Sequence, residues 1–435
     1  MTAAVGREPN QFGARPGVAG ETDSSGLAIP AGASPDWPAA VIAGAYRTGV
    51  LGVRALARRG VRVTSFDADG GLPGFRSKYG RAHRCPDPDT NPDGWLEFMI
   101  GLAARMGGKP VLISSADQFV SAIAKHADVL AAHYILSPGV RLQGLLATKE
   151  TQYELAAKNG MPLPRTRFVN SLEDVTEFAE QAEFPCLLKP IHFREWRAFP
   201  DGHPLSYAKI AIAKTPAELV ASWRLAAAIN PNTIAQEIIL GDDSNKRVYL
   251  ACYDKDGKRV AHAMFRELRC NPLQFGPASV TEPVTDQETD EVCDNFLRRL
   301  GYSGICEIEM KRDTRDGRVK LIEANPRLTG GGDAAPYAGV DLCWLHYLDM
   351  IGVKFSPVAP TRENFRHIDL RNDVAAIFAY RRAGLISWRE VVSSYKSPRA
   401  FFDFDAGDWR YSAETVYRMA RSVARELLTS LRNRS

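Results

Sequence analysis

Residues Gly304 to Arg327, G-I-C-E-I-E-M-K-R-D-T-R-D-G-R-V-K-L-I-E-A-N-P-R, decide the fold of this chain. The stretch predicts two short strands, Ile305 to Lys311 and Val319 to Asn325. A polar turn joins them, and its dipeptide Asp316-Gly317 is a typical hairpin signal. We therefore expect an antiparallel hairpin.

One face of this hairpin gathers acidic side chains. Side chains alternate between the two faces of a strand, so every second residue shares a face. The face in question contains, in chain order, Ile305, Glu307, Glu309, Leu321, Glu323 and Asn325. With the turn near Asp316, Glu309 lies opposite Glu323 and Glu307 opposite Asn325, with about 4.5–5.5 Å between Cβ atoms.

Three carboxylates on one surface favour a divalent cation. Like charges directly opposite each other destabilise a sheet and push a proton onto one of the carboxylates. A cation removes this conflict, and Mg²⁺ (or Mn²⁺) prefers oxygen ligands such as those of Glu309, Glu323 and Asn325. Arg327 follows closely enough to reach the phosphates that accompany such an ion. The alternative is a solvated polar hairpin face without a ligand.

Other segments fall in a fixed order over about 180 residues that end at Arg327. They are Thr148-Lys149, Asn159 to Thr166, Phe184 to Pro190 and Ile234 to Gly241. Together with E-A-N-P-R and the glutamate fourteen residues before its own glutamate, they resemble the signature of the ATP-grasp superfamily. The segments that resemble its carboxylate-amine ligase branch, the one that contains D-aspartate ligase, are Tyr253 to Gly257, Phe265 to Arg269 and Phe275 to Pro277.

The resemblance implies a chain of α/β and α+β domains. A Rossmann-like domain at residues 38–145 is expected before a two-lobed ATP-grasp domain at residues 146–350, whose lid lobe covers about 160–235. The βαβ rhythm of residues 40–66 predicts the parallel sheet of the first domain independently. Residues 1–37 contain few large apolar side chains and predict a disordered tail. Residues 351–435 are expected to form a mainly helical C-terminal extension.

The resemblance also implies a nucleotide-binding set. Its members are Lys149, Lys189, Gln236, Glu237, Ile239, Asp242 and Asp243. The two lysines are expected at the phosphates, residues 236–239 at the adenine and the two aspartates at the ribose hydroxyls. Lys189 has support of its own, because it ends an apolar strand, where a charge needs an anionic partner. For the aspartates, an exposed turn is the alternative.

The implied reaction joins a carboxylate to an amine and forms ADP. The γ-phosphoryl group of ATP moves to the carboxylate and an amine attacks the acyl phosphate, while Lys189 and Arg327 neutralise charge. Arg269 is the expected substrate anchor, since a planar guanidinium suits a carboxylate. We expect ATP, Mg²⁺ (or Mn²⁺) and small-molecule carboxylate and amine substrates. The alternatives are a carboxylase-type enzyme that uses bicarbonate and a non-catalytic nucleotide-binding protein.

Three other loops are weaker candidates. Gly44 to Gly49, followed by Asp67 at the end of the next strand, is compatible with a dinucleotide, but it lacks the G-x-G-x-x-G spacing. Ser115 and Asp117 follow a predicted strand and face either substrate or a helix N-terminus. The segment His192 to His203 departs from the glycine-rich lid of the family and places Arg194 and Arg197 there.

Composition sets broad limits. The chain has 435 residues, 45% of them apolar and 24% charged, which is ordinary for a globular protein. A net charge of +4 gives no general case for nucleic acid. Seven scattered cysteines suggest reduced thiols, and no apolar run is long enough for stable membrane insertion. We expect a cytoplasmic protein and, as in similar enzymes, a possible homodimer.

The last segment of the chain predicts a basic amphipathic helix. Its apolar positions are Val416, Ala420, Val423, Leu427 and Leu431, and the arginines off this stripe are Arg418, Arg421, Arg425 and Arg432. We expect the stripe to pack on the body of the protein or on a second subunit. Contact with a membrane surface is the alternative.

Overall fold

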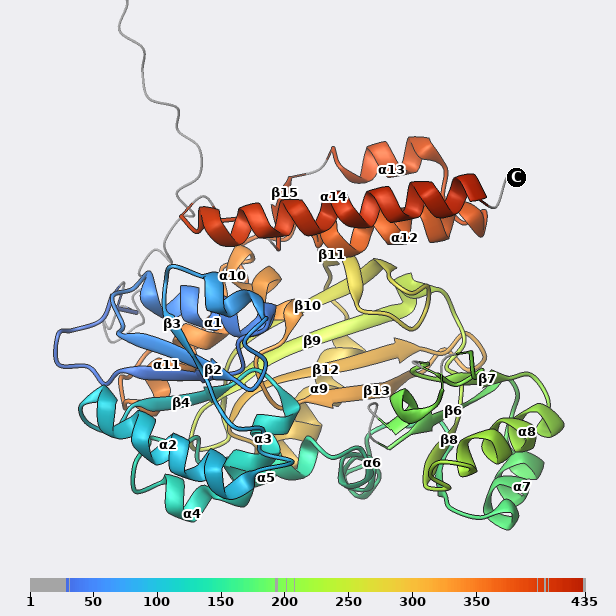
Figure 1. Cartoon of the computed structure of the whole chain (residues 1–435), viewed down its shortest axis with the longest axis horizontal. Helices are drawn as coiled ribbons and strands as arrows, with labels where there is room; N and C mark the ends of the chain where they lie inside the picture. The colour runs from blue at the N-terminus through green and yellow to red at the C-terminus, as the bar shows by residue number, and fades with distance from the viewer. Residues whose placement is uncertain are drawn as a thin grey trace, which may run out of the picture.

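The computed structural model describes residues 29–30, 32–191, 195–200, 202–206, 208–396, 398–402, 404–405 and 407–432, without the side chains of residue 418 and residues 422–432. Three sheets organise this part of the chain (Figure 1). Several side chains named in the sequence analysis lie outside the part that the structure describes. They are those of Arg194, Arg418, Arg425, Arg432, Val423, Leu427 and Leu431.

The first sheet is parallel, with strand order β3-β2-β1-β4, as a Rossmann-like unit requires. Its elements are β1 (Ala40–Ala43), α1 (Arg47–Ala57), β2 (Val63–Asp67), η1 (Pro73–Arg76), β3 (Arg81–Arg84), α2 (Pro92–Met106), β4 (Val111–Ser114), α3 (Asp117–Lys125), α4 (Ala127–Leu130) and α5 (Val140–Leu146). Asp67 is buried and accepts a hydrogen bond from the backbone N–H of Ala45 at 2.9 Å. The Asp67 carboxylate is thus engaged by the loop that follows β1. It is not available to bind the ribose of a dinucleotide, so the dinucleotide alternative is not supported.

The second sheet is antiparallel, with order β5-β8-β6-β7, and lies on the right of the molecule in Figure 1. Its elements are α6 (Lys149–Lys158), β5 (Thr166–Val169), α7 (Leu172–Gln181), β6 (Cys186–Pro190), η2 (Glu195–Ala198), β7 (Ala211–Ala213), α8 (Pro216–Ala227) and β8 (Thr233–Glu237). The Ser171 hydroxyl accepts the N–H of Asp174 and so caps the N-terminus of α7.

The third sheet has seven strands in the order β13-β12-β9-β10-β11-β14-β15. Its elements are η3 (Asp243–Asn245), β9 (Lys246–Tyr253), β10 (Arg259–Cys270), β11 (Ala278–Pro283), α9 (Gln287–Arg299), β12 (Gly304–Arg312), β13 (Val319–Asn325), η4 (Gly330–Asp333), α10 (Ala334–Tyr337), α11 (Leu342–Met350), β14 (Arg366–Ile368) and β15 (Arg399–Phe401). One apolar core fills the space between this sheet, α1 and α11. A second core lies on the opposite face, against α9 and α6.

The C-terminal extension is helical only in part. Helices α12 (Leu370–Arg382), α13 (Trp388–Ser394) and α14 (Trp409–Arg432) form a layer across the top of Figure 1. The two short strands β14 and β15 join the edge of the large sheet, a contribution that the sequence did not predict. Strands of three residues give too short an alternation to be detected.

Residues 29–30 and 32–37, which fall in the predicted N-terminal tail, are ordered. Ile29 is buried, and the Trp37 ring lies 5.9 Å from that of Trp344. The N–H of Ala33 donates to the carbonyl of Arg59 at 2.7 Å. The prediction of disorder is therefore wrong for residues 29–30 and 32–37, which gain order from contacts with α1 and α11. Residues 1–28 and 31 lie outside the described part.

The apolar stripe of α14 also differs from expectation. Val416 is 51% exposed and Ala420 is exposed too, whereas Tyr411 and Thr415 are buried against the body of the protein. The helix packs through the face opposite the predicted one. Among the described residues, no helix is both long and apolar enough to cross a bilayer.

Candidate functional site

The hairpin has the predicted register. Glu309 is paired with Glu323, and Glu307 with Asn325, in the antiparallel pair β12–β13. The pairing shifts by one residue after Glu309, because Met310 pairs with Leu321 and Ile322 is the extra residue of a bulge. Leu321 therefore packs with Met310 in the core on the opposite face. Its predicted place beside Glu323 is wrong, and the bulge is the reason.

The carboxylates of this face repel one another. Burial raises the pKa of Glu309 well above its usual value, and Glu307, Glu267 and Glu323 raise it further. Burial also raises the pKa of Glu307 to about 7, although the hydroxyl of Thr329 donates to it at 2.7 Å. The face therefore favours protonation in the absence of a cation.

The residues at this face fit the metal that the sequence predicted. Glu309 and Glu323 face each other across the hairpin, and their charges conflict unless a cation or a proton compensates. Asn325 adds an amide oxygen next to them, held by a 3.0 Å hydrogen bond from Arg327. Hard oxygen donors of this kind suit Mg²⁺ or Mn²⁺.

Arg327 lies where the Rossmann-like unit meets the hairpin. Its guanidinium donates to both carboxylate oxygens of Asp117, from Nε at 2.5 Å and from Nη2 at 2.9 Å. Asp117 is the first residue of α3, after the carboxyl end of β4, and is about half exposed. The fork of Arg327 thus already holds one carboxylate in a bidentate arrangement.

The site receives positive charge from Lys149, the first residue of α6, and from Lys189 on β6 of the lid sheet. The Lys189 ammonium donates to the side-chain oxygen of Gln236 at 3.0 Å and to the Tyr153 hydroxyl at 3.3 Å. Within the described part of the chain it forms no ion pair. Burial lowers the pKa of Lys149, and the charges of Glu323 and Lys189 also act on it. Two half-buried ammonium groups near each other indicate an anionic ligand.

Tyr153 is a member of this site that the sequence did not predict. Its hydroxyl accepts hydrogen bonds from Lys189 and from Gln236 and donates to the carbonyl of Ile322. It therefore links the lid sheet to the bulge of the hairpin. A Tyr at a buried position of α6 has no local sequence signal, because a core residue fits the same helical spacing.

The pKa of Lys189 makes a pH dependence testable. Burial lowers this pKa to about 8, while Glu323 opposes the shift. The ammonium is charged below that pH and neutral above it, so a bound phosphate loses its partner as the pH rises. We expect the affinity for Mg-ATP to fall about tenfold from pH 7 to pH 9, with proton uptake on binding near pH 8. Calorimetry in buffers of different ionisation enthalpy measures both quantities.

The matched control is Lys189→Arg, whose guanidinium stays charged over the same range. The variant is expected to lose the decline between pH 7 and pH 9. An equal decline in both proteins would assign the titration to another group.

The hinge between the lid and the large sheet offers free backbone groups. Ile239 is buried, yet neither its N–H nor its carbonyl bonds to another described residue. A buried peptide group without a partner is costly and suggests a ligand such as the edge of a purine. Glu237 differs, since its N–H donates to the carbonyl of Arg165 and its carboxylate accepts the N–H of Glu183. Gln236 is buried and points at Lys189 and Thr166.

The two aspartates after the hinge have different surroundings. Asp242 is exposed and caps the turn η3 through Ser244. Asp243 is buried and paired with Lys246 at 3.1 Å. It also accepts the hydroxyl of Tyr380. Its expected ribose contact is therefore not supported, because its oxygens are already used inside the protein.

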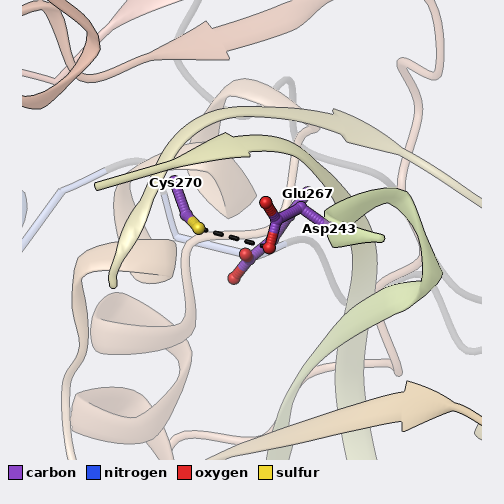
Figure 2. A group of neighbouring side chains, drawn as sticks. All are labelled: Asp243, Glu267 and Cys270. Atoms are coloured by element: carbon purple, nitrogen blue, oxygen red, sulfur yellow. Dashed lines mark hydrogen bonds between the residues drawn. The ribbon is translucent and has the colours of Figure 1, made fainter. Parts of the chain in front are cut away.

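Asp243 belongs to a compact cluster with Glu267 and Cys270, shown in Figure 2. Within the described residues, it is the one group of three acidic, His or Cys side chains whose ligand atoms all lie within 4.8 Å. The Lys246 ammonium contacts Glu267 at 2.9 Å and the Cys270 sulfur at 3.7 Å. Burial raises the pKa of the Cys270 thiol to about 11, so it stays protonated. The cation of this cluster is a lysine, and the geometry does not favour a metal.

The expected substrate anchor, Arg269, is a structural residue. Its guanidinium donates to both oxygens of Asp373 at 2.8 Å, and it is 3% exposed. Arg266, the neighbouring candidate, is paired with Glu282. Neither arginine presents a free guanidinium to a substrate, so the role given to Arg269 is not supported. Its partner lies 104 residues away, beyond the reach of local sequence patterns.

A cavity of about 280 Å³ lies beside the hairpin. It runs along α1 between Thr48 and Arg58, and Leu250 and Ile305 form its floor. Ile305 is two residues before Glu307 on the same face of β12. Thr329, which donates to Glu307, also lines the cavity.

The loop after Arg327 approaches the hairpin closely. A side chain at Gly331 would place its Cβ 2.6 Å from an oxygen of Glu307. Only glycine leaves room for this contact. Ser115, a weaker candidate, donates to the carbonyl of Ala43 at 3.0 Å and is buried in the Rossmann-like unit.

Known proteins resemble this chain in sequence and in fold. No protein-family model matches the chain. A D-aspartate ligase from Enterococcus faecium is 27% identical over 277 residues, which are 60% of this chain and 64% of that protein. The chain thus matches less than two thirds of that relative. A D-alanine–D-alanine ligase from Pseudomonas entomophila is 25% identical over 200 residues, or 56% of its length.

Solved structures match the fold over most of the chain. N5-carboxyaminoimidazole ribonucleotide synthetase, solved with ADP, has a TM-score of 0.60 and 15% identity, and the match covers 80% of this chain and 86% of that protein. An L-amino acid ligase from Bacillus licheniformis has a TM-score of 0.53 and 16% identity over 72% of this chain and 74% of its own. At these identities the likeness concerns the fold.

Proposed function

We propose that this chain, which has the ATP-grasp fold, is an ADP-forming ligase that joins a small carboxylate to an amine. One observation carries the proposal: the acidic hairpin face lies next to the ammonium groups of Lys149 and Lys189, which have few acidic partners. Glu323 affects the pKa of both Lys149 and Lys189, which supports one site shared by the two kinds of charge. The sequence similarity to D-aspartate ligase favours an amine over bicarbonate as the acceptor.

In the proposed reaction the protein binds and orients its substrates. The Ile239 peptide group accepts the adenine edge, and Lys149 and Lys189 hold the phosphates. Arg327 neutralises charge as the γ-phosphoryl group passes to the substrate carboxylate, and the amine then attacks the acyl phosphate with release of phosphate. Asp242 is available for the ribose, since it is exposed. Arg269 has no part in this scheme.

Glu309, Glu323 and Asn325 would hold the metal ion. A bound Mg²⁺ supplies charge neutralisation at the transferred phosphoryl group. The hairpin register places Glu309 opposite Glu323, and Asn325 two residues further along β13, without any flexible loop.

We place the second substrate in the cavity beside Thr329. Of the nucleotide-binding residues proposed above, none lines this cavity. Its floor continues the strand face that bears Glu307 and Glu309, so a molecule seated there has one end near Arg327 and the hairpin. Its volume suits a small molecule.

The domain division at residues 38–145, 146–350 and 351–435 stays a proposal, as do a homodimer and a cytoplasmic location. The three sheets fit the first two boundaries, while β14 and β15 couple the third segment to the large sheet.

The test is ADP release from Mg-ATP across amino acids and other small carboxylates, each combined with a panel of amines. A combination that raises ADP release well above the control without acceptor would support the ligase and name its substrates. Release that depends on bicarbonate alone would favour a carboxylase. Tight ATP binding with no release in any combination would favour a non-catalytic nucleotide-binding protein.

Asp117 provides a further prediction. Its carboxylate occupies the fork of Arg327, so an anionic substrate group has to displace it. We expect Asp117→Asn to tighten the binding of inorganic phosphate to the Mg-ADP complex by up to about fivefold, the scale of a half-exposed ion pair. Calorimetric titration measures the change.

Asp128→Asn is the matched control, because Asp128 is an exposed partner of Arg141 on the surface of the same unit. It is expected to leave phosphate binding unchanged. Weaker binding in Asp117→Asn would instead mean that Asp117 orients Arg327 for its ligand.

A further inference from the structure

The net charge of the chain resides in its last segment. Residues 409–435 contain six arginines and two glutamates, a net charge of +4, which equals the formal net charge of the whole chain. The other 408 residues therefore carry equal numbers of acidic and basic side chains. A segment with such an excess of arginine favours an anionic partner.

The solvent-exposed face of α14 combines apolar and basic side chains. Trp409 is 65% exposed, Val416 51% and Tyr417 61%. Arg410 and Arg421 are exposed on the same helix. Tyr411 and Thr415 face the protein, so the apolar side chains on the outer face stay in solvent. Their apolar surface is not buried by folding and adds nothing to the stability of the fold.

Each exposed aromatic ring of α14 has an arginine beside it. The guanidinium of Arg410 lies 5.5 Å from the centre of the Trp409 ring, and that of Arg421 lies 5.9 Å from the centre of the Tyr417 ring. Aromatic and basic side chains occur together where a helix lies at a membrane–water interface, with the rings at the level of the headgroups.

The neighbouring helix α13 adds to this surface. It belongs to the same C-terminal layer, at the top of the molecule in Figure 1. Trp388 is 55% exposed and Val392 57% exposed, and Arg381 lies 5.4 Å from the centre of the Trp388 ring. A further exposed aromatic ring with an arginine beside it thus lies between α12, which carries Arg381, and α13, which carries Trp388.

We propose that the outer face of α14 binds the surface of an anionic lipid bilayer, with the helix lying in the plane of the headgroups. Charge distinguishes this partner from a second copy of the chain, because the rest of the chain has no acidic excess to meet the arginines. Stacked nucleic-acid bases would use the aromatic rings but not the exposed aliphatic side chain of Val416, whereas a bilayer interface takes up both. This inference does not depend on the proposed reaction.

The test is flotation of the full chain with vesicles of phosphatidylcholine alone and of phosphatidylcholine with an equal part of phosphatidylglycerol. We expect binding to the anionic vesicles only, and less of it as salt is raised. The double variant Val416→Glu with Tyr417→Glu is expected to lower the partition coefficient at least about tenfold. Both side chains are exposed, so folding should not change.

Two matched controls address non-specific effects. Leu225→Glu changes an apolar residue that is 42% exposed on α8 of the lid lobe, and Arg141→Glu changes an exposed arginine on α5. Neither is expected to alter flotation. Equal binding to neutral and anionic vesicles, or no binding to either, would overturn the proposal. A dimer in light scattering that Val416→Glu with Tyr417→Glu dissociates would assign the face to a second copy instead.

Discussion

Glu323→Ala is expected to abolish ADP-forming turnover and to leave the fold intact. Glu323 faces Glu309 across the hairpin and acts on the charge of both Lys149 and Lys189, so its loss removes a metal ligand and changes the electrostatics of the phosphate site. The metal contributes several kcal/mol at the transferred phosphoryl group, which corresponds to a loss of at least about a thousandfold in kcat. ADP release at saturating Mg-ATP measures it.

The stability of the same variant tests the repulsion at this face. Glu323 raises the pKa of Glu309, so its removal relieves a conflict between carboxylates. We expect the metal-free Glu323→Ala protein to be at least as stable as the wild type in a thermal melt. Added Mg²⁺ should stabilise only the wild type, because a ligand stabilises the state that binds it.

Asp316→Ala is the matched control, because Asp316 is an acidic residue of the same hairpin but lies at its turn, paired with Lys320. It is expected to keep most of the activity. Full turnover in Glu323→Ala would remove this residue from the metal site and with it the proposed mechanism.

Asp373→Ala is expected to destabilise the protein by about 3–5 kcal/mol, since it leaves a buried arginine without its counter-charge. Asp373 has no exposed surface and accepts both Arg269 bonds. It also accepts the hydroxyls of Ser279 at 2.7 Å and Tyr395 at 2.5 Å. These contacts fix α12 and α13 to the large sheet. Denaturant unfolding measures the loss.

The double variant Arg269→Met with Asp373→Leu distinguishes a structural pair from a catalytic residue. Replacing both partners of a buried ion pair by apolar side chains is often nearly neutral. We expect the double variant to recover most of the lost stability and to bind Mg-ATP normally. A stable double variant without turnover would return Arg269 to the role of substrate anchor.

Prediction from sequence succeeded where a feature depends on neighbours in the chain. The pairing of Glu309 with Glu323 follows from strand alternation and from a turn at Asp316-Gly317. The bulge at Ile322 did not follow, because an extra residue in one strand leaves no mark in the alternation until the partner strand is known. Leu321 was misplaced for that reason.

The candidate site shows the same division. Lys189 was expected at an anion because a charge at the end of an apolar strand needs a partner, and its hydrogen-bond partners in the structure, Tyr153 and Gln236, are neutral. Arg269 was expected there by an equally sound chemical argument, yet Asp373 holds it. Chemical type predicts what a side chain is able to bind, but the number of partners that reach it depends on distant segments.

The sequence by itself determined the hairpin, the pairing of Glu309 with Glu323, the parallel sheet of the first domain and the residue types that suit phosphate and metal. Periodicity, turn residues and local motifs encode these features over a few residues. Only the tertiary structure decided that Asp117 meets Arg327 from 210 residues away, that residues 32–37 pack on α1 and α11, and that Val416 and Ala420 of α14 face solvent. Such contacts depend on how whole helices and strands pack against one another. A local sequence pattern does not encode that packing.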